Sequence, residues 1–132
     1  MVWAIILLAV VILFAWFHPD ELKRRKYESS LASREAVTGE QLFQQFFKVN
    51  EIASDVPGAV RAIFAKHMSY PAEKMLPDDD FNFFWNEMDM ADLVRDVESR
   101  FDISISDSDA ERCRCTIRSV SLLVASKCAA KV

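Results

Sequence analysis

Apolar and polar positions divide the chain into one continuous apolar run and a series of amphipathic segments. Residues 2–17 read VWAIILLAVVILFAWF, sixteen apolar residues without a charge. As a helix this run spans about 24 Å, slightly less than the roughly 30 Å of a bilayer's hydrocarbon core. Trp3 and Trp16 lie near its ends, where amphipathic rings favour the headgroup level. Residues 1–19 are therefore predicted to form a transmembrane helix that ends at Pro19.

The charges that flank this run predict its orientation. Four basic residues follow it, and only the α-amino group precedes it: Lys23, Arg24, Arg25 and Lys26. By the positive-inside rule the basic flank stays in the cytoplasm, which makes this a single-pass membrane protein with a cytoplasmic domain. A cleaved signal peptide is the alternative, but the run has no basic n-region and no A-x-A cleavage site.

Residues 20–54 are predicted to be a juxtamembrane linker followed by an amphipathic helix. Residues 20–38 are polar, and either continue the first helix for a turn or two or act as a linker. Residues 39–53 have apolar positions at mostly helical spacing: Leu42, Phe43, Phe46, Phe47, Val49 and Ile52. This aromatic stripe packs either on the following domain or on the bilayer surface.

Residues 55–127 are predicted to form a small helical bundle. Asp55 caps a helix that has Pro57 in its first turn, and a loop over 69–82 follows. The apolar face of this helix holds Val60, Ile63, Phe64 and Met68. A second helix runs from Glu87 to Arg100, with a stripe of Met90, Leu93, Val94 and Val97. The helical periodicity and the lack of a convincing strand pattern predict an all-α fold.

The end of the bundle contains two more helical signals. Ser106, Asp107 and Asp109 begin a short helical turn. Thr116 is a good N-cap for a last helix with four inward positions: Ile117, Val120, Leu123 and Val124. The chain from Ala125 onward is expected to fray, with residues 128–132 as a tail.

Charge and cysteine usage narrow the function. The net charge is −4, and residues 78–111 hold twelve acidic and two basic residues. An acidic stretch argues against binding to nucleic acid and favours a protein partner with a basic surface. The alternative is that it forms a solvated face without a partner. The three cysteines are Cys113, Cys115 and Cys128. Their odd number and the close spacing of the first two do not resemble the disulfide framework of a secreted protein. With only two histidines in the chain, no metal site is predicted.

Five segments resemble the acyl carrier protein family, in order and with similar spacing. The region of likeness, residues 58–126, spans about half of the chain, and the five segments in it are VRAIF at 60–64, LPDDDF at 76–81, LVRDVESRF at 93–101, ISDSDAE at 105–111 and TIRSV at 116–120. The resemblance implies a four-helix bundle of the carrier type, here preceded by the transmembrane helix and the extra amphipathic helix. It also implies a role in acyl or lipid metabolism.

The chain departs from that family at the attachment site for phosphopantetheine. Carrier proteins hold Asp-Ser-Leu at the head of the second helix, and the alignment puts Asn86-Glu87-Met88 there. No serine or threonine occurs between Tyr70 and Glu98. A carboxylate would give only a labile anhydride and would repel the incoming phosphate. We therefore expect no phosphopantetheine and no other cofactor.

Three functions remain open, none of them enzymatic. The first is a membrane-anchored interaction module that docks on a protein through the acidic second helix, with these contact residues: Trp85, Glu87, Met88, Asp89, Asp92 and Asp96. The second is a non-covalent binder of a fatty chain, or a working carrier, with a cavity lined by Phe84, Met88, Met90 and Phe101. The third is a structural subunit of a membrane complex.

Overall fold

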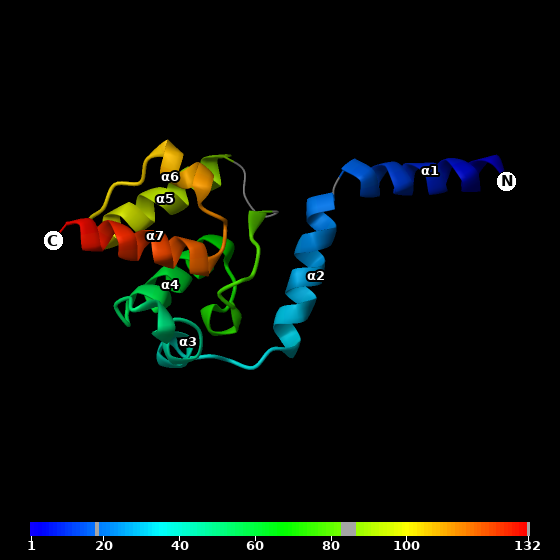
Figure 1. The fold of residues 1–132 in the computed structure, drawn as a ribbon. Helices are drawn as coiled ribbons and strands as arrows, with labels where there is room; N and C mark the ends of the chain where they lie inside the picture. The colour runs from blue at the N-terminus through cyan, green and yellow to red at the C-terminus, as the bar shows by residue number, and fades with distance from the viewer. Residues whose placement is uncertain (18, 83–86, 132) are drawn as a thin grey trace. The chain divides into compact units, whose positions relative to one another are not determined.

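The computed structural model describes the backbone of residues 1–17, 19–82 and 87–131, and the side chains of residues 1–14, 21–82 and 90–131 (Figure 1). The chain divides into two compact units, residues 1–33 and 34–132. Across the described residues all regular structure is helical and there is no strand. The predicted all-α class is thus confirmed.

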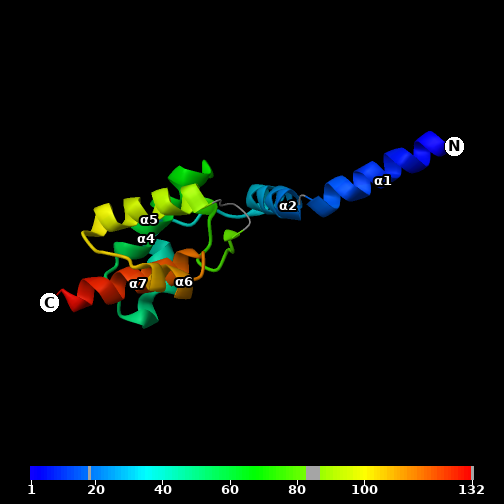
Figure 2. The same ribbon diagram turned by 90° about the horizontal axis from the view of Figure 1, so that it is seen from above.

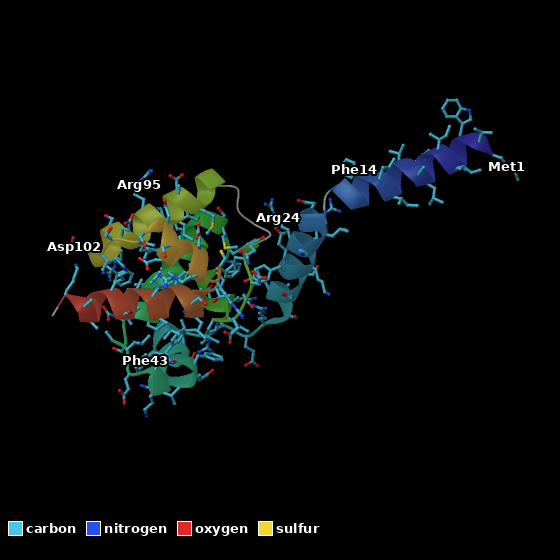
Figure 3. All side chains as sticks on the ribbon, turned by 45° about the horizontal axis from the view of Figure 1, so that its top comes forward. Met1, Phe14, Arg24, Phe43, Arg95 and Asp102 are labelled. Atoms are coloured by element: carbon cyan, nitrogen blue, oxygen red, sulfur yellow. The ribbon has the colours of Figure 1, made fainter. Side chains whose placement is uncertain are left out.

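The first unit contains α1, Val2–Phe17, and α2, Pro19–Ser33. Every described side chain of α1 is exposed, and in Figure 3 these side chains project on all sides of the helix between Met1 and Phe14. Among the residues that the structure describes, no helix is long and apolar enough to cross a membrane. The predicted transmembrane helix over residues 1–19 is therefore not confirmed. The physical reason is length, because sixteen residues rise about 24 Å and the next helix is strongly polar.

Helix α2 replaces the predicted linker over much of residues 20–38. Its fifteen residues include several strong helix formers, among them Glu, Leu, Lys and Arg. Pro19 is its first residue, a position where the missing N–H costs no helical hydrogen bond. The helix has no apolar stripe, so periodicity did not indicate it.

The second unit begins with α3, Gly39–Phe46. A capping box starts it, in which Gln41 N–H donates to Thr38 Oγ1 and Thr38 N–H donates to Gln41 Oε1. The helix predicted over 39–53 is too long, because a 3₁₀ turn at Lys48–Asn50 follows and ends at Glu51 with a left-handed φ of 54°. α3 contacts α4 of the bundle, and both Leu42 and Phe47 are fully buried. The aromatic stripe therefore packs on the domain.

Helix α4, Val56–Met68, is at the centre of the bundle. It contacts α3, α5 (Glu87–Phe101) and α7 (Ile117–Ala130), and it lies between α5 and α7 in Figure 2. Val60 and Phe64 on its predicted apolar face are fully buried, and the Phe64 ring lies 5.4 Å from that of Phe81. Their burial contributes to the hydrophobic stabilisation of the fold, by about 1.5–3 kcal/mol for each large side chain.

Side-chain caps begin the last two helices, and the cap at Thr116 is the predicted one. α6, Asp107–Arg112, begins with a capping box between Ser106 and Asp109. α7 begins after Thr116, whose side chain accepts the N–H of Ser119. The predicted fraying from residue 125 is wrong, because α7 continues to Ala130 through residues with little β-branching.

Two aspartates hold the long loop between α4 and α5, which includes the 3₁₀ turn Ala72–Lys74. Asp79 accepts two hydrogen bonds from Arg34, at 2.6 and 3.0 Å. Asp78 accepts two from Arg118, at 2.7 and 3.0 Å, and Arg118 also donates to the carbonyl oxygen of Phe46 at 3.0 Å. The loop is thus tied to the segment before α3 and to α7.

Candidate functional site

The predicted docking helix begins at Glu87 as predicted and ends one residue later than predicted, since α5 spans Glu87–Phe101. Glu87 is its first residue, where a negative charge is favoured by the helix dipole. Trp85 lies outside the described residues, and so do the side chains of Glu87, Met88 and Asp89. The helix runs on through Asp92 and Asp96, so its backbone carries the predicted acidic face at i, i+3 and i+7.

Asp92 and Asp96 have different environments. The Asp92 side chain is 57% exposed, and among the described side chains its one ion pair is with Arg95 of the same helix at 3.3 Å. Asp96 is bound to α4, because its Oδ2 lies 2.6 Å from His67 Nε2 and 3.4 Å from Lys66 Nζ. The hydrogen bond from His67, with the charge of Lys66, holds the pKa of Asp96 below its ordinary value. Asp92 is therefore available to a partner, whereas Asp96 already connects two helices.

Several other acidic residues of the 78–111 stretch also have basic partners within the bundle. Lys127 Nζ lies 2.7 Å from Asp109 Oδ2, and Lys131 Nζ lies 3.3 Å from Asp102 Oδ2. The Lys127 bond, together with the N–H and hydroxyl of Ser106, lowers the pKa of Asp109 to about 2. Folding thus brings the basic residues of the flanking segments onto the acidic stretch. The folded surface is therefore less acidic than the separation of acidic and basic segments along the sequence indicates.

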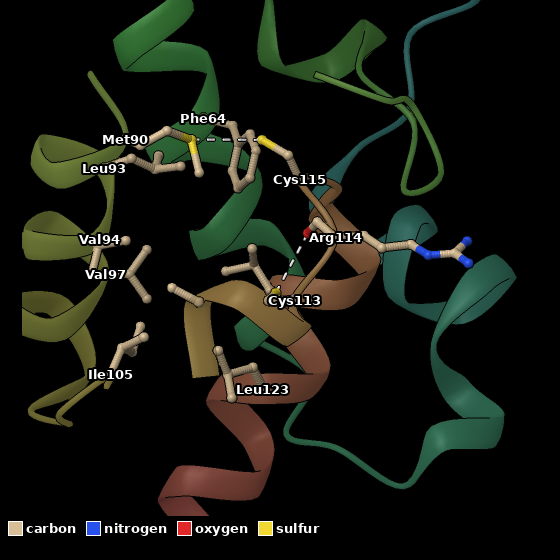
Figure 4. A pocket seen from close by; sticks show the side chains of 12 residues that line it. Phe64, Met90, Leu93, Val94, Val97, Ile105, Cys113, Arg114, Cys115 and Leu123 are labelled. Carbon is tan, nitrogen blue, oxygen red and sulfur yellow. Dashed lines mark hydrogen bonds between the residues drawn. The ribbon is translucent and has the colours of Figure 1, made fainter. Parts of the chain in front are cut away.

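A small apolar cavity lies between α4, α5, α6 and α7 (Figure 4). Its volume is about 40 Å³, and α5 contributes Leu93, Val94 and Val97 to its wall. The cysteines of the α6–α7 link also line it, with Cys115 Sγ 4.0 Å from Met90 Sδ and Cys113 Sγ donating to the Arg114 carbonyl oxygen at 3.4 Å. Figure 4 shows the Arg114 guanidinium directed away from the cavity.

The sequence located this cavity only in part. Of the residues expected to line it, Met90 does so and Phe101 does not. Phe84 and the Met88 side chain lie outside the described residues. Cys115 is buried and Cys113 and Cys128 are half-buried, and burial raises the pKa of the Cys113 thiol. A raised pKa keeps this thiol protonated and unreactive.

Arg61 of α4 is a buried cation that sequence reasoning missed. It is 5% exposed, and within the described part of the chain its Nη1 has no hydrogen-bond partner. Burial lowers the pKa of Arg61, and the nearby charge of Glu73 opposes this shift. The only sequence signal was its place between Val60 and Phe64 on the inward face of the helix.

The described side chains contain no group of three or more His, Cys, Asp or Glu residues that could hold a metal ion. No family model and no curated protein sequence matches the chain. Among the described residues the geometry therefore offers two candidate binding sites, the exposed Asp92 of α5 and the apolar cavity beside this helix.

Proposed function

We propose that this chain is a non-catalytic, carrier-like binding module without a phosphopantetheine arm, and that α1 attaches it to a membrane. The observation that carries the proposal is the exposure of α1. All thirteen described side chains of α1, from residue 2 to 14, are uncharged and face solvent. Contiguous apolar surface of this kind is characteristic of an interaction site rather than of a free surface in water.

A bilayer is the partner that fits α1 best. The helix is apolar on every side, so it has no polar face with which to lie flat at an interface. A helix about 6 Å shorter than the hydrocarbon core can still enter it, because local thinning costs only a fraction of a kcal/mol per Å. The basic residues at 23–26 favour a cytoplasmic bundle by the positive-inside rule.

Alkaline carbonate extraction of membranes from cells that express the full chain tests this attachment. We expect the protein to stay in the pellet, and Leu8→Glu/Val11→Glu to move it to the supernatant, because charges at mid-helix are costly in a bilayer. The matched control, Leu22→Glu/Val49→Glu, changes two exposed apolar residues outside α1 and should stay in the pellet. Extraction of the wild-type protein would contradict the proposal.

The bundle would dock on a basic protein surface through the start of α5. Glu87 takes the place of the attachment serine, so the partner would recognise the negative charge of this surface and not a phosphopantetheine arm. Asp92 supports this role because it is exposed and weakly paired. Asp96 is removed from the set of contact residues, since its carboxylate is bound to His67.

Photo-crosslinking in intact cells tests the docking surface. A photoreactive residue at position 88 of the full chain should give a discrete protein adduct. Charge reversal at Glu87, Asp89 and Asp92 to lysine should reduce its yield at least tenfold. The control reverses three exposed acidic residues outside α5, Asp80, Asp107 and Glu111. An equal loss in both variants would mean that net charge, and not this surface, governs the contact.

The cavity supports a second candidate, non-covalent binding of an apolar chain. Its lining is almost wholly apolar, but about 40 Å³ is far below the roughly 300 Å³ at which ligand pockets usually begin. Only a few carbons fit unless α5 moves. This second function requires that calorimetric titration with decanoate show binding that Val94→Phe abolishes, and no heat with the wild-type protein would exclude it.

A further inference from the structure

We infer that residues 23–26 of α2 bind anionic phospholipid headgroups beside the point where α1 enters the bilayer. The inference rests on the proposed membrane attachment and adds the class of lipid. Its two observations are independent: the exposed apolar surface of α1, and an unbroken run of four cations in the helix that follows it, Lys23, Arg24, Arg25 and Lys26.

The four cations surround the axis of α2. Successive residues of an α-helix are rotated by about 100°, so four in a row cover its whole circumference. Lys23, Arg25 and Lys26 are exposed, and Arg24 is half-buried. Arg25 has an ion pair with Glu21 at 3.5 Å, but both side chains are largely exposed and such pairs are weak. Cations therefore face the membrane whichever way α2 is directed.

Covalent geometry keeps the run close to the bilayer. The link from Phe17 to Pro19 extends at most about 8 Å, and the four helical steps to Lys23 add about 6 Å. The first cation is thus within about 14 Å of the end of α1. Headgroups occupy roughly 6 Å on each side of the hydrocarbon core, and charge acts over a Debye length of about 8 Å. Flexible lysine and arginine side chains cover the remaining distance.

Because the rest of the chain is acidic, any attraction to an anionic membrane must come from these four cations. The protein has a net charge of −4, so an anionic surface repels the molecule as a whole. Residues 1–33 contain only three acidic residues, Asp20, Glu21 and Glu28. Each basic residue near an anionic membrane strengthens binding about fivefold, so the four together amount to several hundredfold.

A competition assay tests the inference with the full chain. The protein is added to equal amounts of phosphatidylcholine vesicles and vesicles with 30% phosphatidylglycerol, which are then separated by density. The test variant changes all four cations to glutamine, which preserves helix propensity. The control variant loses the same charge from four exposed residues of the bundle: Lys48, Arg112, Arg114 and Lys131.

We expect at least ten times more wild-type protein on the anionic vesicles, a preference that 0.5 M salt weakens. The test variant should distribute evenly, and the control variant should behave as the wild type. Even distribution of the wild type would overturn the inference while leaving membrane attachment intact. An equal loss of preference in both variants would also overturn it. Protein that floats with neither vesicle would instead contradict the proposed function.

Discussion

Asp96 and His67 join α5 to α4 through a 2.6 Å hydrogen bond between Asp96 Oδ2 and His67 Nε2. The bond to His67 is the main cause of the lowered pKa of Asp96. A lowered pKa in the folded state means that the ionised carboxylate stabilises the fold. That stabilisation is present above about pH 4, the ordinary aspartate range, and is lost as the pH falls through the lowered pKa.

Asp96→Asn should therefore lower the melting temperature at pH 7 and have a smaller effect at pH 3. Asp92→Asn is the matched control, because Asp92 lies on the same helix with a more exposed and longer ion pair. Thermal unfolding followed by circular dichroism at both pH values checks this. Equal effects of the two substitutions would show that the bond to His67 contributes nothing.

Hydrogen bonds between residues far apart in the sequence, such as this one, could not be predicted from the sequence. The starts of α5 and α7 followed from the apolar period and the Thr116 cap, which are local signals. The partner of Asp96 lies 29 positions away on α4, and no local pattern indicates it. The sequence therefore located the acidic face but assigned Asp96 to a partner protein.

The difference between local and long-range signals also explains why only some of the cavity-lining residues were predicted. Met90 and Val97 belong to the predicted stripe of α5 and do line it. The link between α6 and α7 closes the opposite wall, and its path depends on how those helices pack. Helix α2 was missed for a different reason, because propensity without an apolar stripe leaves no periodic signal.

Asp109 should titrate with a midpoint near 2. The bond from Lys127 and the cap of α6 lower the pKa of this carboxyl to about 2, so the pair persists until strongly acidic pH. Carboxyl-carbon chemical shifts measured by NMR during a pH titration check the value. Lys127→Met should raise the midpoint, whereas Lys131→Met, which removes the cation beside Asp102, should not. An unchanged midpoint in the first variant would contradict the assignment.

Replacing Arg61 with methionine should leave stability unchanged or raise it by about 1–2 kcal/mol. A buried cation with an unpaired donor loses hydration without full compensation, and an apolar side chain of similar volume removes that cost. Arg118→Met is the contrasting variant, expected to cost about 2 kcal/mol, because Arg118 donates to Asp78 and Phe46. Urea unfolding measures both. A large loss in the Arg61 variant would show that its charge has a partner.

Phe64→Ala should lower the free energy of unfolding by about 3–5 kcal/mol. Phe64 is fully buried, packs on Phe81 and forms part of the cavity wall, so its removal enlarges an existing void. Val49→Ala, at a position that is 89% exposed, should change stability by less than about 0.5 kcal/mol. Similar losses in the two variants would contradict the core described for α4.

The absence of an arm is the central claim, and intact mass spectrometry tests it most directly. The full chain from native membranes is incubated with coenzyme A and a promiscuous phosphopantetheinyl transferase. A variant with the family's triplet restored, Asn86→Asp/Glu87→Ser/Met88→Leu, is treated in parallel. We predict an unchanged wild-type mass and a gain of one phosphopantetheine in the variant. A wild-type protein that gains this mass would contradict the account, and an unmodified variant would contradict the resemblance to carrier proteins.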